Sequence, residues 1–351
     1  MRCVTLANEL LKHGLRSSFL CRKFDGSLNH LIVKSKFKLI ELQSTSKLAP
    51  TVNCGTPFHH RWLGVNWEDD AAECMLHVNE KVRYLVVDHY ALDSRWEEQM
   101  STKVDKIIVM DDLADRPHLG DLLIDQNIGR SRSDYLELLS PKTKTLLGPH
   151  FALLRPEFRN LRDYSLNRRL ENSKLEKLFV NFGGVDSENI TAKVIKSLEK
   201  LSSFDLKQVI VVAGHSYKFY RNLEQMCASI SLPISLYRGV NNMAALMAEC
   251  DLAIGASGST TWERCCLGLP TIQIVLAENQ QHVAEQIRDR NAGEICDKNE
   301  VSSQILNIVE SFFEQQKLSN FTKNCAQLVD GLGTSRVVEN ILNINQHENA
   351  I

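Results

Sequence analysis

The sequence predicts an α/β protein with two parallel-sheet domains in series, and three observations support this prediction. The chain has 351 residues, which exceeds a typical single core and suits two domains. Short apolar runs alternate with amphipathic stretches in both halves, as buried parallel strands and their connecting helices do. Residues 155–176 begin with Arg-Pro and become polar, which suits a short helix and an exposed linker. We therefore expect a boundary near Ser173, with domains 1–173 and 174–351.

Six strands are expected in each half. In the first half the apolar runs are 17–21, 38–42, 83–88, 106–110, 121–125 and 144–147. In the second half they are 177–182, 208–212, 234–237, 251–254, 271–275 and 294–296. This rhythm predicts one doubly wound sheet in each domain.

The chain opens with a predicted helix. Residues 1–13 place Val4, Ala7, Leu10 and Leu11 on one face, and Gly14 suits the C-cap. A doubly wound domain normally opens with a strand and a glycine turn, because that turn meets the ligand. Either this fold begins with a helix, or its first strand lies outside the sequence.

Composition excludes several classes of protein. The chain is 43% hydrophobic and 24% charged with a formal net charge of −2, so no basic footprint indicates nucleic acid or an anionic membrane. No apolar run approaches the roughly 20 residues of a membrane span. Ten cysteines form no C-x-x-C pattern, and eleven histidines show no zinc-site spacing. We expect reduced thiols in the cytosol, no metal, no cofactor and no obligate protein partner.

The most informative stretch runs from Gly255 to Glu263, between an apolar run and a helical pattern that begins at Arg264. A helix start exposes unpaired N–H groups and partial positive charge, and small residues let an anion approach them. Hydroxyls in the turn add donors, and Glu263 is placed to accept both hydroxyls of a ribose. The stretch therefore predicts a nucleoside diphosphate site. The alternative is a capped helix whose dipole Glu263 complements.

A second small-residue turn, Gly183-Gly184, follows the run 177–182. Two such turns at strand ends are able to face one ligand. The alternative is an ordinary tight turn between a strand and a helix.

Several ordered motifs then give a family likeness over nearly the whole chain. They are VVDHYALDSRWE at 86–97, MDDLADRPH at 110–118, LLIDQNIGR at 122–130, LLGPHFALLRPEFRNLR at 146–162, NFGGVDSENIT at 181–191, GASGSTTWERCCLGLP at 255–270 and AENQQ at 277–281. Together they resemble the UDP-sugar hydrolases of pseudaminic acid biosynthesis. The second half more distantly resembles the nucleotide domain of the GT-B glycosyltransferase that adds N-acetylglucosamine to lipid II precursors.

The resemblance implies a GT-B architecture, in which two Rossmann-like domains hold a UDP-sugar in the cleft between them. It implies a cytoplasmic, metal-independent hydrolase that releases UDP from UDP-2,4-diacetamido-2,4,6-trideoxy-β-L-altropyranose. The free sugar would serve a nonulosonic acid on a surface glycan, such as that of glycosylated flagellin. UDP-sugar and water are the partners that it implies, with no nucleic acid or membrane.

Site residues follow from the same resemblance. It assigns the diphosphate to Ser257, Gly258, Ser259, Thr260 and Thr261, the ribose to Glu263, and the uracil to the loop from Arg238 to Met243. It assigns the diphosphate or sugar to Asn279 and Gln280, with Gly183 and Gly184 facing the same ligand. It places Tyr90 beside the sugar and Arg155 at the domain crossing.

Each assignment has a structural alternative. Tyr90 could cap a strand end, Met243 could be core, and Arg155 could pair with a surface carboxylate. Asp111-Asp112 could bind a metal, although acidic pairs after a strand more often cap helices. His59-His60 is expected in an exposed loop.

In the implied reaction, water attacks the anomeric carbon with inversion and UDP departs. A histidine suits the general base, since its pKa lies near neutrality. In the family this histidine belongs to a G-x-G-H-x-M-R turn, and the sequence begins at the Met1-Arg2 that would complete it. We therefore expect the base upstream of Met1, with His89 as the nearest substitute and Tyr90 as a weak candidate. A glycosyltransferase and a base-less nucleotide-sugar binding protein are the competing functions.

Overall fold

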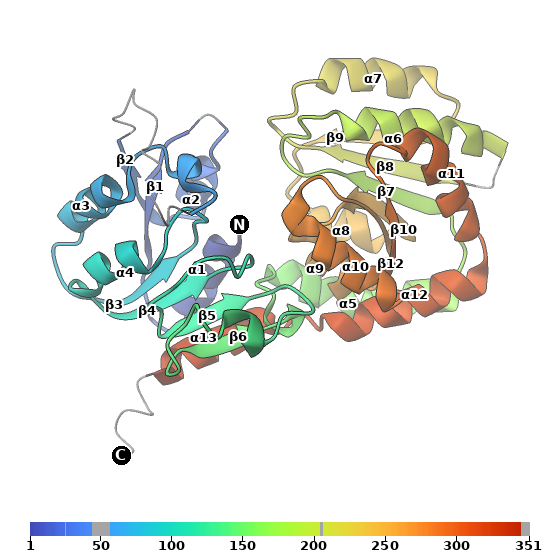
Figure 1. Ribbon diagram of the computed structural model, residues 1–351. Helices are drawn as coiled ribbons and strands as arrows, with labels where there is room; N and C mark the ends of the chain where they lie inside the picture. The colour runs from blue at the N-terminus through green and yellow to red at the C-terminus, as the bar shows by residue number, and fades with distance from the viewer. Residues whose placement is uncertain (25, 44–56, 204–205, 345–351) are drawn as a thin grey trace. The chain divides into compact units, whose positions relative to one another are not determined.

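The computed structural model describes residues 1–24, 26–43, 57–203 and 206–344, which form two compact α/β units (Figure 1). Unit 1 contains Met1–Leu153 and the segment that begins at Gly333, and unit 2 contains Leu154–Leu332. Our sequence-based boundary at residue 173 lies inside unit 2. The chain thus passes into unit 2 before its long helix and returns to unit 1 for its last helix.

Unit 2 contains one six-stranded parallel sheet with the order β12-β11-β10-β7-β8-β9. Its strands are β7 (Lys177–Asn181), β8 (Gln208–Ala213), β9 (Ile234–Arg238), β10 (Leu252–Ala256), β11 (Thr271–Ile274) and β12 (Gly293–Cys296). All six coincide with predicted runs. Strands β7, β8, β10 and β11 are almost wholly buried, which explains why they appear in the sequence as continuous apolar runs.

Helices cover this sheet in two layers. They are α5 (Pro156–Glu171), α6 (Ile190–Leu198), α7 (Tyr220–Ser229), α8 (Met243–Ala248), α9 (Thr260–Cys266), α10 (Gln281–Asp289), α11 (Val301–Ser311) and α12 (Gln315–Leu328). Helix α6 contacts α7 and α11, while α5 contacts α8, α9 and α12.

Unit 1 has two parallel sheets among its described residues, one with the order β3-β4-β5-β6 and one that pairs β1 with β2. The strands are β1 (Ser18–Arg22), β2 (Lys38–Leu42), β3 (Val82–Val87), β4 (Val104–Met110), β5 (Leu122–Asp125) and β6 (Lys144–Leu147). All six strands lie where predicted, but the single sheet expected for this half is divided.

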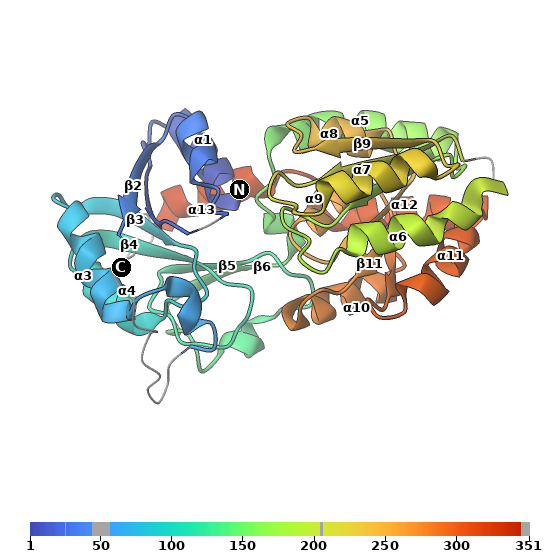
Figure 2. The ribbon, with the colours of Figure 1, turned by 90° about the horizontal axis from the view of Figure 1, so that it is seen from above.

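The helices of unit 1 include the predicted opening helix. They are α1 (Arg2–Lys12), α2 (Asn29–Lys34), α3 (Trp67–His77), α4 (Ser94–Ser101) and α13 (Gly333–Asn343). Helices α1 and α13 lie side by side although they come from opposite ends of the chain (Figure 2). Leu6 and Leu10 of α1 share a buried cluster with Val337 and Ile341 of α13.

For residues 155–176 the sequence predicted a short helix and an exposed linker. The structure instead has the long helix α5, part of which is buried. Arg169 is only 1% exposed and donates to the carbonyl oxygens of Met247, Cys250 and Leu267, at 2.7 Å for the first two. These carbonyls lie at the ends of α8 and α9, where helices leave C=O groups without intrahelical partners. Burial lowers the pKa of the Arg169 guanidinium to about 10.

Two further arginines of α5 act in the same way. Arg162 donates to the carbonyl oxygens of Ala326 and Val329, at 2.6 and 2.7 Å, at the end of α12. Arg168 donates to Ala248 O at 3.0 Å and pairs with Asp251 at 2.8 Å. Helix α5 therefore satisfies the carboxyl ends of three helices at once.

We expect Arg169→Met to destabilise unit 2 by about 3 to 5 kcal/mol, because it leaves several buried carbonyl groups unpaired. Urea denaturation monitored in unit 2 measures this change. Arg159→Met is the control on the same helix, since Arg159 is partly exposed and pairs with the exposed Asp163 at 3.4 Å, and its effect should stay within about 0.5 kcal/mol. Equal effects of the two substitutions would contradict the role assigned to Arg169.

Candidate functional site

The two predicted small-residue turns lie at neighbouring strand ends in unit 2. Strands β7 and β10 pair in parallel, with Asn181 opposite Gly255, so their following turns share one edge of the sheet. The chain runs from β7 outward through β8 to β9, and then crosses to β10 on the other side of β7. This is the topological switch point at which open α/β sheets bind ligands.

Only some of the residues that were predicted to bind the diphosphate are accessible in the β10–α9 turn. Gly258, Ser259 and Thr260 are at least partly exposed, whereas Ser257 and Thr261 are buried. The Ser257 hydroxyl donates to Gln273 Oε1 at 2.8 Å, so it holds the turn against β11. The accessible hydrogen-bond donors therefore belong to Gly258, Ser259 and Thr260, in the middle of the turn.

Hydrogen bonds from Arg264 stabilise this turn. The sequence analysis did not predict Arg264 as a site residue. Its guanidinium is buried and donates to Ala256 O at 2.7 Å and to the hydroxyls of Thr261 and Thr260, at 3.0 and 3.3 Å. Burial lowers its pKa to about 10. A Cβ on Gly255 would lie 2.7 Å from Arg264 Nη1 and 2.6 Å from Asn181 O, so only glycine fits there.

Glu263 and Arg155, both predicted site residues, meet in unit 2. Arg155 Nη2 lies 3.3 Å from Glu263 Oε1, and Arg155 Nη1 lies 3.0 Å from Glu157. Burial raises the pKa of the Glu263 carboxyl, and Arg155 offsets part of that rise. Arg155 therefore pairs with a carboxylate, as the alternative interpretation held, but that carboxylate belongs to the candidate site.

The β7–α6 turn differs from the β10–α9 turn in its helix start. Gly183 and Gly184 are exposed, and Gly183 adopts φ +79°, which favours glycine. Asp186 accepts from the backbone N–H groups of Ile190 and Thr191 at 2.8 and 2.9 Å. The start of α6 thus already holds a carboxylate, and only the glycine backbone is left to face a ligand.

The remaining predicted residues of unit 2 occupy other strand ends. Gln280, in the short helix η5 (Glu278–Gln280) after β11, lies beside Gly258, since its amide nitrogen is 4.0 Å from a Cβ built there. Asn279 is exposed in the same segment. Arg238 ends the edge strand β9 and donates to His215 O at 3.0 Å, while Met243 begins α8 half-buried. A uracil contact from this loop stays a prediction.

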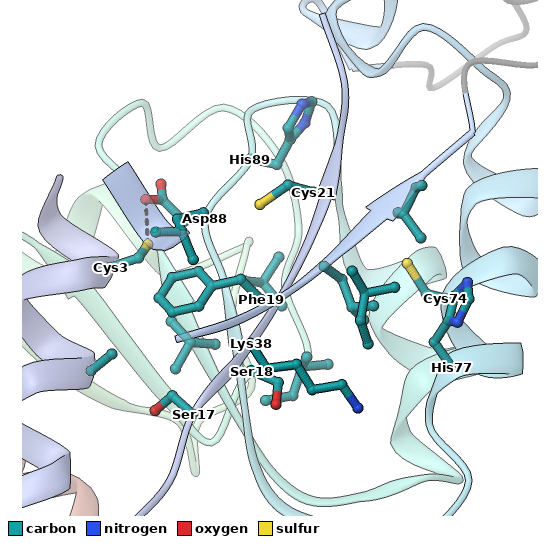
Figure 3. Close-up of a pocket in the computed structure, with 18 of the residues that line it drawn as sticks. Cys3, Ser17, Ser18, Phe19, Cys21, Lys38, Cys74, His77, Asp88 and His89 are labelled. Carbon is teal, nitrogen blue, oxygen red and sulfur yellow. Dashed lines mark hydrogen bonds between the residues drawn. The ribbon is translucent and has the colours of Figure 1, made fainter. Parts of the chain in front are cut away.

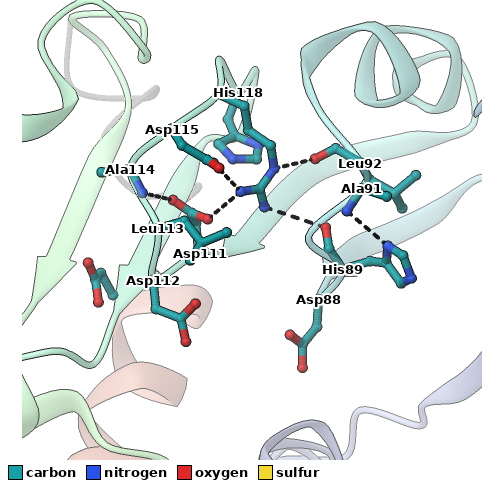
Figure 4. A network of polar contacts seen from close by, with 12 residues as sticks. Asp88, His89, Ala91, Leu92, Asp111, Asp112, Leu113, Ala114, Asp115 and His118 are labelled. Atoms are coloured by element: carbon teal, nitrogen blue, oxygen red, sulfur yellow. Dashed lines mark hydrogen bonds and ion pairs between the residues drawn. The ribbon is translucent and has the colours of Figure 1, made fainter. Parts of the chain in front are cut away.

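In unit 1, Asp88, His89 and Tyr90 follow β3 at its carboxyl end. Figure 4 shows Asp88 and His89 there. His89 Nδ1 accepts from the Ala91 N–H at 3.1 Å. Burial lowers the pKa of His89. Nδ1 therefore bonds within its own loop, and a role of His89 as a substitute base stays a prediction.

Tyr90 forms an aromatic cluster with His59 and Trp62, with ring centroids 5.5 and 5.7 Å from its own. His59 is half-buried here rather than part of the exposed loop that we expected. Burial and the neighbouring Asp112 carboxylate raise the pKa of Tyr90, so its hydroxyl stays protonated at neutral pH. A protonated phenol is poorly suited to act as a base.

The Asp111-Asp112 pair has local partners. Asp111 pairs with the buried Arg116 at 2.8 Å and accepts from the Ala114 N–H at 2.9 Å, as Figure 4 shows for Ala114. Asp112 pairs with Arg2 at 3.2 Å. Within the residues that the structure describes, no three His, Cys, Asp or Glu side chains gather as a metal site. Nor is any described helix long and apolar enough to cross a bilayer.

Comparison with known proteins yields one family match and several relatives. Residues 178–341 match the glycosyltransferase family 28 C-terminal domain. An uncharacterized protein of Methanocaldococcus jannaschii is 25% identical over 80% of this chain and 52% of its own length. The UDP-2,4-diacetamido-2,4,6-trideoxy-beta-L-altropyranose hydrolase of Campylobacter jejuni is 28% identical over 58% of this chain and 70% of its own length. The chain thus spans about half to seven tenths of these relatives.

Among solved structures, MurG of Acinetobacter baumannii aligns with a TM-score of 0.66 and 13% identity, covering 97% of this chain and 95% of that one. The fold is of the GT-B type, with Rossmann-like units, as the sequence predicted. Together, the domain match and the curated relatives support a GT-B nucleotide-sugar family.

We expect Arg264→Met to loosen the β10–α9 turn, because it removes the donors that hold Ala256 O and two threonine hydroxyls. Amide exchange in residues 256–261 should quicken at least about tenfold, while β8 and β9 stay unchanged. Arg288→Met is the control, since Arg288 is half exposed beside Asp289. Unchanged exchange in the turn would contradict this stabilising role.

A second prediction concerns the buried carboxyl of Asp125 in unit 1. Tyr135 donates to it at 2.9 Å and the Asn127 N–H at 2.8 Å, yet burial raises its pKa to about 7. Its unfolded value is about 3.9, so between these values only the folded chain holds the proton. Stability therefore falls as pH rises from about 4 to about 7, by up to about 1.4 kcal/mol per unit from this group.

Asp125→Asn should remove that slope, which urea denaturation at pH 5 and pH 8 measures. Asp105→Asn is the matched control, because Asp105 is about half exposed in a pair with Lys81. A slope that survives in Asp125→Asn and equals that of the control would show that another group titrates.

Proposed function

We propose that the chain is an enzyme that binds a UDP-sugar at the switch point of unit 2 and releases UDP from it. The observation that carries this proposal is the meeting of two small-residue turns at the ends of β7 and β10, beside the carboxylate of Glu263. The family 28 match across residues 178–341 supports the same interpretation.

In the proposed site, different residues bind different parts of the nucleotide. The backbone of Gly258 to Thr260 holds the diphosphate, helped by Gln280 and Asn279, and Glu263 accepts the ribose hydroxyls. The buried guanidinium of Arg264 adds positive charge beneath the turn. UDP is already a good leaving group, so the main task of these donors is to stabilise the charge that develops as the C–O bond breaks.

For the reaction we favour hydrolysis of UDP-2,4-diacetamido-2,4,6-trideoxy-β-L-altropyranose, in which water attacks the anomeric carbon with inversion. The motifs at residues 86–97, 181–191 and 255–270 and the 28% identical hydrolase support this choice. In this proposal Tyr90 borders the sugar, and no described side chain is assigned as the base.

Transfer to an acceptor is the second candidate, and the glycosyltransferase family 28 match favours it. The two reactions differ in where the sugar goes. Incubation with the UDP-sugar in oxygen-18 water should release UDP and place the label on the sugar if the chain is a hydrolase. UDP release only when an acceptor is added would favour transfer, and binding without release would favour a binding protein.

We expect Glu263→Gln to weaken UDP binding about ten- to a hundredfold, because it removes a charged acceptor for the ribose hydroxyls. Calorimetry with UDP and 2′-deoxy-UDP isolates that contact: the parent should prefer UDP, and Glu263→Gln should bind both alike. Glu157→Gln is the control, since it removes the other carboxylate paired with Arg155. A preference for UDP that persists in Glu263→Gln would contradict the ribose assignment.

A further inference from the structure

Unit 1 exposes a cluster of aromatic rings at the carboxyl end of β3. The cluster consists of Phe58, His59, Trp62 and Tyr90, and we call it the aromatic surface. The ring centroids of Phe58 and His59 are 5.0 Å apart, those of His59 and Trp62 are 4.4 Å apart, and those of Trp62 and Tyr90 are 5.7 Å apart. Phe58 is 84% exposed and Trp62 is 55% exposed. Contiguous exposed apolar groups indicate a binding surface, whereas single exposed apolar residues are ordinary.

The segment that carries Trp62 is anchored in the core of unit 1. Trp62 lies in the short helix η1 (His60–Leu63), which ends at Gly64 with φ +76°. Leu63 and Val65, on either side of this glycine, are buried in one apolar cluster. The exposure of Trp62 is therefore a property of a packed segment, in which its neighbours face the core and its own ring faces outward.

The loop that carries Tyr90 is also held on both sides. Before Tyr90, the Cys3 thiol donates to the Asp88 carboxylate at 2.9 Å, as Figure 3 shows. After Tyr90, the buried guanidinium of Arg116 donates to Leu92 O at 2.8 Å. The aromatic surface is thus built from two anchored segments, and a ligand that binds to it has little ordering entropy to overcome.

The aromatic surface lies beside a hollow rather than on a flat face. Trp62, Asp88 and His89 are among the residues that line a cavity of about 1160 Å³ (Figure 3). Small-molecule sites are concave, with apolar walls and a few polar groups that orient the ligand. The protonated hydroxyl of Tyr90 supplies one such group, as a hydrogen-bond donor among the rings.

We propose that the aromatic surface binds the sugar of the nucleotide-sugar and selects sugars that carry apolar substituents. This inference rests on the proposed function and names the sugar chemistry that unit 1 recognises. The sugar favoured there carries two acetamido groups, and a methyl group replaces its hydroxymethyl group. Three of its substituents therefore end in methyl groups, which gain free energy when they leave water against aromatic rings. A hydroxyl group in the same place loses its hydrogen bonds to water.

Saturation-transfer NMR with free sugars tests this proposal without the nucleotide. In the parent, saturation should reach the acetamido and C6 methyl protons of 2,4-diacetamido-2,4,6-trideoxy-L-altrose, and N-acetylglucosamine should bind about tenfold more weakly. Trp62→Ala should weaken binding of the first sugar about tenfold, while Trp62→Phe, which keeps an aromatic face, should restore most of it. Leu76→Ala is the matched control, since Leu76 of α3 is 76% exposed but lies outside the aromatic surface.

Calorimetry with UDP separates this inference from the proposed function. UDP should bind the parent and Trp62→Ala alike, because the aromatic surface contacts only the sugar. Loss of UDP affinity in Trp62→Ala would show that Trp62 supports the fold and would overturn the proposal. So would equal binding of the two sugars, or saturation transfer to neither of them. If the parent binds the diacetamido sugar through Trp62 but does not bind UDP, the nucleotide site proposed in unit 2 fails while the aromatic surface stands.

Discussion

The fold of unit 2 depends on buried arginines that donate to backbone carbonyl groups. Helix ends inside a packed layer leave C=O groups that water cannot reach, and each such group is costly unless it finds a donor. Arg162, Arg168 and Arg169 supply those donors from one helix, and so fix the ends of α8, α9 and α12 around α5. The price is a set of desolvated guanidinium groups, whose lowered basicity is visible at Arg169.

The candidate site uses the same chemistry. Arg264 donates to a carbonyl and two hydroxyl oxygens, which leaves its positive charge close behind the β10–α9 turn. The atoms that it bonds are neutral oxygens, and the carboxylate that acts on it is that of Glu263, within the candidate site. The β7–α6 turn has the opposite arrangement, since Asp186 fills the helix start with negative charge. The two turns therefore differ in charge. The β10–α9 turn has a buried positive charge beside it, whereas the β7–α6 turn presents exposed glycine backbone next to a buried carboxylate.

The sequence predicted all twelve strands to within about two residues, because buried parallel strands are continuous apolar runs. It also located the β10–α9 turn and Glu263, whose chemistry is local. It missed Arg264 and misjudged α5, since arginine ordinarily indicates solvent exposure and the partners of Arg169 come from residues some 80 to 100 positions away. The hydrogen bond from Ser257 to Gln273 could not be predicted either, because Ser257 follows β10 whereas Gln273 lies on β11, 16 positions further along the sequence. The division of the sheet in unit 1 depends on strand pairing, which no apolar run encodes.

The contact between α1 and α13 has a consequence for biosynthesis. Unit 1 buries Leu6 and Leu10 against Val337 and Ile341, so its core requires both ends of the chain. Domains generally fold in order as they leave the ribosome, beginning with the amino-terminal one. Here unit 2 is complete after Leu332, before α13 is translated. Unit 1 is therefore begun before unit 2 but completed after it, and its apolar surface stays exposed during translation until α13 covers it.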